Sequence, residues 1–462
     1  MNGETGQGGP GGMGGAVASD TDILVVGAGA AGLFAATWAS RTCPDLHVMA
    51  VDGAKTLGAK ILVAGGGRCN VTHHAVDERD YRGAPPAAVR AVLRRFSVED
   101  TIRFFAECGV ELKREETGKL FPVTDKARTV LDALLGAAST AGVHVLHPCR
   151  VQSIRANGDT FGVSTERGVV RARCVILCTG GMSLPRSGSD GAGFAIARSL
   201  GHTTTRLIEP ALVPLTLPAG HWLAQLSGVS LPASVSIVLA SGARAPVHGK
   251  PLKPIEAAVL CTHFGLSGPA ILDASRHWIH AHADDPSARL IIQWLPGLSA
   301  EALDQRLIEV KGRSVLAALH GLLPERFLRA ACAEAHVDTA AGVQQVPRDR
   351  RQALTRLLCA CEVMPSGTRG FTAAETTAGG IPLDEIDCAT MMSRRTADMF
   401  VCGEVLDVDG RIGGFSFQWA WASGFIAGCA AADRACFLRA RSTVSSHPAN
   451  GESTRHSGRA SE

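Results

Sequence analysis

One segment near the start of the chain constrains the fold more than any other. Residues 22–52 read DILVVGAGAAGLFAATWASRTCPDLHVMAVD. They predict a short strand buried on both faces, a GxGxxG turn, an alanine-rich helix and a second apolar strand that ends in an acid. This order predicts a Rossmann-type α/β domain that binds a dinucleotide.

Each residue of this motif has an expected physical role. Gly27 permits the tight turn, Gly29 lets the backbone approach a pyrophosphate, and Gly32 lets helix and strand pack closely. The helix begins near Ala30 and Ala31, whose free N–H groups favour phosphate. Asp52, at the end of the second strand, is expected to accept hydrogen bonds from ribose hydroxyls. An acid there disfavours a 2′-phosphate, so the motif predicts FAD or NAD and leaves the two open.

The next segment, GAKTLGAKILVAGGGRCN (residues 53–70), follows this acid directly. Its three consecutive glycines, with Gly66 and Gly67 as predicted contacts, bring backbone N–H groups against the cofactor. Lys60 and Arg68 are expected to offset the charge of phosphate or of a reduced flavin. Asn70 is expected to hydrogen-bond a ring or ribityl atom.

The extended segment GAKILVAGGGRCNVTHH resembles the GRKILxSGxGRCNxTN-like signature of the BaiN-like bacterial flavoproteins, which include 3-dehydro-bile-acid reductases and aminoacetone oxidases. Residues 117–127 (TGKLFPVTDKA), 262–270 (THFGLSGPA) and 374–387 (AETTAGGIPLDEID) are similar to further segments of that family. The resemblance covers nearly the whole chain between its polar ends and implies FAD as the cofactor. Ala258 stands where family members often carry glutamate, which implies a different substrate if that acid serves one.

Two later segments complete the expected cofactor site. In residues 175–193, a buried strand ends in Thr179, Gly180 and Gly181, where backbone passes close to the dinucleotide. The resemblance also implies an adenine contact by the backbone of Val151. In residues 400–421, two acids follow the last predicted strand, and one of them is expected to hold the ribityl hydroxyls. Two glycines then precede a predicted helix, whose N-terminus is expected to face the flavin ring. The predicted contacts there are Gly403, Glu404, Asp407, Gly413, Gly414 and Phe415.

Three residues are tentative catalytic candidates. Cys69 is either a packed thiol or a reactive one beside the flavin. His263 either lines a substrate pocket or belongs to a structured turn, and Arg186 is a candidate anion-binding group near the pocket. No metal site is expected, because no cysteines have CxxC spacing.

The expected fold class is α/β, with a discontinuous Rossmann-type FAD-binding domain formed by residues 21–204 and 365–436. Residues 205–298 alternate short β-like runs with prolines and glycines and predict a β-barrel-like insert. Residues 299–364 have helical periodicity and predict a helical insert. The glycine-rich residues 1–20 and the polar residues 437–462 are expected to be disordered.

Charge and composition limit the partners. A net charge of +3 over 462 residues argues against nucleic acid as the main partner. No apolar run reaches the ~20 residues that span a bilayer. The cysteine pattern favours a reducing compartment. We therefore expect a cytoplasmic protein with a small-molecule substrate, and the oligomeric state is left open.

The predicted function is that of an FAD-dependent oxidoreductase acting through flavin N5. By resemblance, the favoured chemistry is reduction of an activated C=C bond. NADH or NADPH would be a transient donor, because GSDGAG (residues 188–193) does not form a second GxGxxG motif. The alternatives are an amine-type oxidase that releases H2O2 and a non-redox protein with structural FAD. A simple NAD-dependent dehydrogenase is disfavoured because the C-terminal segment that begins with Gly403 and Glu404 has no role in a simple NAD-binding fold.

Overall fold

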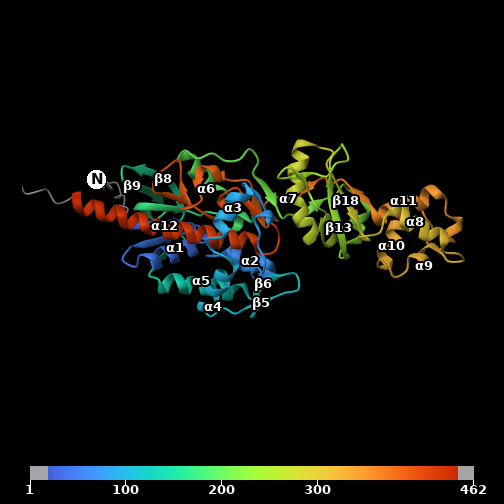
Figure 1. Cartoon of the computed structure of the whole chain (residues 1–462), viewed down its shortest axis with the longest axis horizontal. Helices are drawn as coiled ribbons and strands as arrows, with labels where there is room; N and C mark the ends of the chain where they lie inside the picture. Colours follow the sequence, from blue (N-terminus) through green and yellow to red (C-terminus); the bar gives the residue numbers. More distant parts are fainter. Residues whose placement is uncertain (1–18, 446–462) are drawn as a thin grey trace, which may run out of the picture.

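The computed structural model describes residues 19–445, with side chains as far as residue 441. Figure 1 shows two parts arranged along the long axis of the molecule. One contains both described ends of the chain, and the other ends in the group of helices α8 to α11. None of the helices in residues 19–445 combines the length and apolar character needed to cross a bilayer.

The first part is built on a mainly parallel sheet centred on β1 (Ser19–Val26). Residues 23–26 are fully buried, as expected for a parallel strand covered on both faces. β1 pairs in parallel with β2 (Val48–Val51) and β10 (Gly168–Leu177). The sheet continues to β7 (His144–Leu146) on one side and through β24 (Met399–Val401) to antiparallel β23 (Met392–Ser393) and β22 (Ile386–Asp387) on the other. The hairpin of β8 (Val151–Asn157) and β9 (Thr160–Thr165) extends from β10. The predicted Rossmann-type fold is therefore confirmed.

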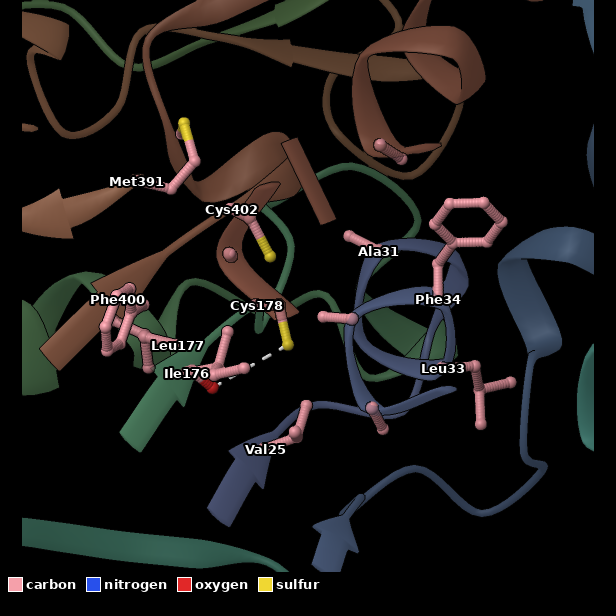
Figure 2. Packing of buried hydrophobic residues seen from close by; sticks show 14 of the residues in the cluster. Val25, Ala31, Leu33, Phe34, Ile176, Leu177, Cys178, Met391, Phe400 and Cys402 are labelled. Carbon is pink, nitrogen blue, oxygen red and sulfur yellow. Dashed lines mark hydrogen bonds between the residues drawn. The ribbon is translucent and has the colours of Figure 1, made fainter. Parts of the chain in front are cut away.

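The core of this part gathers side chains from neighbouring strands and from α1 (Ala30–Thr42). Figure 2 shows Val25, Ile176 and Phe400 from three strands on the side of the view opposite Phe34 of α1. The buried Cys178 thiol donates to the carbonyl oxygens of Val26 (3.3 Å) and Gly27 (3.2 Å). It therefore packs as a small side chain.

The last helix, α12 (Phe415–Ser445), lies against α1, so the end of the chain completes the first domain. Glycines permit the close approach: a Cβ on Gly428 would lie 2.3 Å from the Ala35 carbonyl oxygen. A disulfide joins Cys43, after α1, to Cys436 of α12. The expectation of reduced cysteines does not hold for this pair.

Smaller elements surround this core. Three antiparallel strands, β3 (Thr72–His73), β6 (Lys119–Pro122) and β5 (Leu112–Arg114), form one small sheet, and β4 (Tyr81–Gly83) pairs with β25 (Val408–Gly410). The helices are α2 (Ala59–Gly67), α3 (Pro86–Leu93), α4 (Val98–Glu107), α5 (Ala127–Thr140) and α6 (Ala192–Ser199). Short 3-10 turns occur at Glu78–Asp80, Pro185–Ser187, Leu383–Glu385 and Gly403–Val405.

Two strands carry the chain between the parts. β11 (Glu209–Ala211) leaves the first part and pairs antiparallel with β21 (Thr376–Ala378), which returns to it. We call this pair the crossing ribbon.

The second part contains an antiparallel seven-stranded sheet in the order β19-β18-β13-β16-β17-β12-β20. Its strands are β12 (Leu215–Thr216), β13 (Ser230–Val238), β16 (Ile255–Thr262), β17 (Gly265–Ser267), β18 (Arg289–Gln293), β19 (Cys361–Val363) and β20 (Gly367–Thr368). A separate hairpin is formed by β14 (Pro246–Val247) and β15 (Lys250–Pro251), and 3-10 turns occur at Trp222–Leu226 and Val343–Gln345. The helices are α7 (Pro269–Asp284), α8 (Ala300–Glu309), α9 (Val315–Leu319), α10 (Glu325–Glu334) and α11 (Arg348–Cys359).

The expectation of a β-barrel-like insert is wrong, because the strands form an open sheet. No pairing joins its end strands β19 and β20 within residues 19–445, so the sheet is open. Both end strands follow the helices in sequence, outside the range assigned to the β-rich insert. Buried side chains of the sheet and of helices α8 to α11 belong to one hydrophobic cluster, because the helices cover apolar surface that the sheet exposes.

The prediction of disordered ends is wrong for the residues nearest the folded domain. Ser19 and Asp20 belong to β1, where they pair with β10. Residues 437–445 continue α12, where Leu438 is buried and Arg439 donates to the Asp45 carbonyl oxygen. The rest of both predicted ends lies outside the described residues.

Candidate cofactor and substrate site

A cavity of about 460 Å³ opens at the carboxyl end of β1 and β10, where doubly wound sheets bind ligands. Most of the predicted cofactor contacts line it. These are Gly27, Gly29, Ala30, Ala31, Asp52, Lys60, Gly66, Arg68, Asn70, Val151, Thr179, Gly180, Glu404, Gly413 and Gly414. Segments separated by hundreds of residues in sequence therefore meet around one space.

The GxGxxG turn has the geometry of an anion cradle. Gly27 has φ of 101°, a left-handed conformation that favours glycine. A Cβ on Gly29 would meet no atom within 4 Å, so this position faces open space at the cavity. No side chain caps the N-terminus of α1, which leaves its N–H groups for a ligand. Gly32 lies outside the lining, where a Cβ would come within 1.8 Å of the Gly27 carbonyl oxygen.

Asp52, which follows β2, connects this turn to the second strand by hydrogen bonds. Its carboxylate accepts from the backbone N–H groups of Ala28 (2.7 Å) and Ala54 (2.8 Å). The residue also lines the cavity, so the acid is held rigidly at its edge. Its role toward ribose hydroxyls stays a prediction.

The glycine run at the C-terminal end of α2 adopts left-handed backbone at three successive positions. Gly65, Gly66 and Gly67 have φ of 57°, 69° and 86°. Side chains would strain this conformation, which is a second reason for glycine besides close backbone contact. Gly66 lines the cavity, whereas Gly67 does not.

The two predicted cations at the cavity are already paired. Lys60 contacts the Glu404 carboxylate and the Ser183 hydroxyl. Arg68 pairs with Glu115 at 2.6 Å and lies over the Phe121 ring, 4.1 Å from its centroid. Both cations therefore carry less free positive charge than the sequence suggests.

Four buried polar atoms along the cavity lack a hydrogen-bond partner within the described residues. They are Asn70 Oδ1, Thr179 Oγ1, Ser189 Oγ and Thr376 Oγ1. Buried polar atoms are normally satisfied, so this set points to a polar ligand. A dinucleotide with hydroxyls and a flavin ring with N–H and C=O groups fits this lining.

The N-terminus of α12 closes another side of the cavity. Gly413, Gly414, Ser416 and Phe417 line it. Phe415 turns away: its ring stacks on His73 at a centroid distance of 5.0 Å. The Tyr81 hydroxyl donates to its carbonyl oxygen at 2.8 Å.

The remaining predicted contacts serve packing. A Cβ on Gly181 would lie 2.4 Å from Thr377 Oγ1, and one on Gly403 would lie 2.8 Å from Ala31 Cβ. Asp407 lies away from the lining, where burial, and then the charge of Asp409, raise its pKa to about 6. Of the two acids after the last strand, only Glu404 therefore reaches the cavity.

The three tentative catalytic residues do not line the cavity. Cys69 is fully buried, and burial raises the pKa of its thiol to about 12, which disfavours the reactive thiolate. His263 belongs to a tight turn that Thr262 closes by donating to the Gly265 carbonyl at 2.9 Å. Arg186 lies exposed in a 3-10 turn. The geometry thus gives these three assignments no support.

Sequence reasoning missed several residues of the cavity lining. Leu212, Lys119, Glu375, Arg411 and Ile412 line it. The segments TGKLFPV and AETTAGG drew attention in the sequence, but no pattern within them indicates which side chain faces a ligand. Within residues 19–445, no group of His, Cys, Asp or Glu is suited to a metal ion.

Comparisons with known proteins agree with this architecture. The chain is 31% identical to the 3-dehydro-bile acid delta(4,6)-reductase of Clostridium scindens over 89% of its own length and 99% of the relative's. It is also 31% identical to the ribosomal RNA dihydrouridine synthase of Escherichia coli, covering 87% of this chain and 96% of that protein.

A solved quinol-fumarate reductase shares the fold, with a TM-score of 0.50 and 17% identity over 92% of this chain and 74% of that chain. The family model described as the HI0933-like protein Rossmann domain matches residues 21–430. The chain therefore belongs to the HI0933-like family of Rossmann-domain, FAD-dependent oxidoreductases.

Proposed function

We propose that this protein is an FAD-dependent reductase that uses NADH or NADPH to saturate a carbon–carbon double bond conjugated to a carbonyl group. The substrate would be a small organic molecule. The observation that carries the proposal is a single cavity lined both by the GxGxxG turn and by Lys119, Glu375 and Arg411. It offers a cofactor cradle and a separate group of ionisable side chains in one space.

The relatives support this choice of bond. One is named for reducing delta(4,6) bonds of a 3-dehydro-bile acid, and the other for making dihydrouridine. Both names imply saturation of a double bond conjugated to a carbonyl. The near-neutral charge of +3 supports a small substrate over an RNA for this chain.

FAD, when bound, would supply hydride transfer between the nicotinamide and the substrate. Gly27, Gly29 and the N-terminus of α1 would hold its pyrophosphate, with Asp52 beside the ribose. Gly413, Gly414 and the N-terminus of α12 would stabilise negative charge at the ring end. The second part of the molecule would cover the substrate and exclude water, and residues 212–375 are proposed to form this covering domain.

We also propose a cytoplasmic location. Most cysteines of the described residues are free thiols, as expected for a reducing compartment.

The test starts with the purified protein, which is expected to be yellow and to be bleached anaerobically by NADH or NADPH. The reduced protein is then mixed with a 3-oxo-4-ene steroid or with a uridine-containing RNA, and the products are identified by mass spectrometry. Reoxidation by the steroid, with gain of two hydrogens, is the expected result.

Other outcomes would overturn the proposal in distinct ways. A colourless protein that takes up no FAD contradicts the cofactor assignment. Fast reoxidation by air with stoichiometric H2O2, unaffected by either probe, indicates an oxidase. A flavin that neither nucleotide reduces indicates a structural FAD. Reduction of the RNA alone overturns the small-molecule assignment and retains the bond type.

A further inference from the structure

Glu375 lies where the second part of the molecule returns to the cofactor domain. It directly precedes β21 of the crossing ribbon. Its backbone N–H donates to the Leu212 carbonyl at 3.2 Å, which extends the ribbon by one further bond. Ser183 Oγ donates to its carbonyl oxygen at 3.5 Å. The backbone is thus held from both sides, and both Glu375 and Leu212 line the cavity.

The Glu375 carboxyl lines the cavity without a hydrogen-bond or ion-pair partner among the described residues. The residue is exposed toward the cavity. By contrast, the Glu404 carboxylate contacts Lys60 and Ser183 and accepts the Thr377 N–H at 3.0 Å. A carboxyl without a protein partner at a ligand cavity is free to exchange a proton with the ligand.

Charged groups from several elements face this carboxyl. Lys119 comes from β6, Lys60 from α2 and Asp273 from α7 of the second part. Although the side chain is accessible from the cavity, the protein around it partly removes water from the carboxyl, and this raises the pKa of Glu375. Lys119 lowers this pKa, Asp273 raises it and Lys60 lowers it, in decreasing order of effect. The carboxyl therefore keeps its proton to higher pH than an ordinary glutamate, as a proton donor near neutral pH requires.

Two further cations, Lys119 and Arg411, line the cavity together with Glu375. Lys119 lies over Gly413, where a Cβ would be 3.6 Å from Lys119 Cε, and makes no side-chain hydrogen bond or ion pair within the described residues. Arg411 is held by Asp80 at 3.3 Å and by Asp273 at 3.5 Å. A cavity lined by an acid and two cations suits a substrate on which an oxygen gains negative charge.

We propose that Glu375 is a catalytic residue that donates the proton in the reduction of the conjugated double bond. The inference rests on the proposed function. Hydride adds to the carbon β to the carbonyl, and the π electrons move to the carbonyl oxygen. When the carbonyl re-forms, the α carbon takes the proton from Glu375. NADH or NADPH is oxidised by two electrons, the substrate is reduced by two, and the carboxylate recovers a proton from water.

The first experiment separates the two half-reactions in FAD-loaded E375Q, E375A and E375D. The matched control is E209Q, because Glu209 lies on the other strand of the crossing ribbon and does not line the cavity. E375Q should bind FAD and be reduced by NADH or NADPH as the wild type is. Its reoxidation by the 3-oxo-4-ene steroid should slow by about 100-fold or more. E375D should restore part of the rate, and E209Q should behave as the wild type.

The second readout needs no substrate. In infrared difference spectra of the FAD-loaded protein during a pH titration, the wild type should show protonated carboxyl bands that persist above the ordinary titration range of glutamate. Asp407 and Asp273, whose pKa values are also raised, contribute to these bands in the wild type and in E375Q alike. The wild-type minus E375Q spectrum should therefore contain the band of one further carboxyl, and identical bands in the two proteins overturn the inference.

The two failures are distinguishable. If the wild type is not reoxidised by the steroid, the proposed function fails, and the infrared titration alone decides whether Glu375 holds a proton at the site. If the wild type is reoxidised and E375Q keeps the same rate, the proposed function stands and the role of Glu375 is overturned.

Discussion

At the residue scale, two glycines of the GxGxxG motif have different roles. Gly29 faces open space at the cavity, whereas a Cβ on Gly32 would collide with the Gly27 carbonyl oxygen at 1.8 Å. The first position therefore concerns a ligand, and the second concerns the packing of α1 against the turn. Substitution can separate the two roles.

We expect Gly29→Ala to fold normally and to weaken FAD binding by about tenfold or more, which corresponds to ~1.4 kcal/mol. Gly32→Ala should lower the free energy of unfolding of the apoprotein by about 1–3 kcal/mol, since backbone must shift to admit the methyl group. FAD fluorescence titration and chemical unfolding measure the two effects. Wild-type stability of Gly32→Ala, or wild-type FAD affinity of Gly29→Ala, would contradict this division.

At the element scale, contact between the first and last helices completes the cofactor domain. The N-termini of α1 and α12 both border the cavity, and we propose that the first faces the phosphates of FAD and the second its ring. Gly424 and Gly428 bring the α12 backbone close to α1. The placement of both helix ends therefore depends on small residues at this contact.

Gly428→Ala should destabilise the protein by about 1–3 kcal/mol, because the Cβ would lie 2.3 Å from the Ala35 carbonyl oxygen. The matched control is Gly136→Ala in α5, where a Cβ meets no atom within 4 Å. Alanine is favoured over glycine in a helix by about 1 kcal/mol, so this control should be stabilising. Thermal unfolding followed by circular dichroism compares them, and equal shifts in Tm would refute the proposed role of the contact.

At the scale of the whole molecule, buried charges connect the two parts. Arg276 of α7 contacts Asp409 of β25 at 2.8 Å, and both side chains are only 2% exposed. Arg276 also donates to the carbonyl oxygens of Asp80 and Asp409. Nearby, Arg82 of β4 contacts His277 of α7 at 2.6 Å. These contacts connect α7 of the second part to β4 and β25 of the first.

Removing Arg276 leaves Asp409 as an unpaired buried charge, so Arg276→Ala should cost about 3–5 kcal/mol of stability. The control is Arg206→Ala. It breaks an exposed ion pair with Asp284, the last residue of α7, and should cost at most about 1 kcal/mol of stability. Urea unfolding measures both. Similar costs for the two variants would show that burial of the Arg276 pair contributes little.

Much of the fold and of the cofactor cradle could be predicted from local sequence. The buried run of β1, the GxGxxG turn and Asp52 have roles set by backbone conformation and by the space that a Cβ would occupy. Such constraints act among residues close together in the chain, so their spacing is readable. The helical pattern of residues 299–364 is likewise local, whereas the open sheet needed strands β19 and β20 from beyond it.

What the sequence by itself determined is the nucleotide-binding unit, because local sterics and hydrophobic periodicity specify it. Only the tertiary structure decided that Glu404 reaches the cavity while Asp407 does not, and that Cys69 is buried. It also brought Lys119, Glu375 and Arg411 together from distant segments. The physical reason is that the direction of a side chain depends on how distant segments pack, and no spacing in the sequence records that.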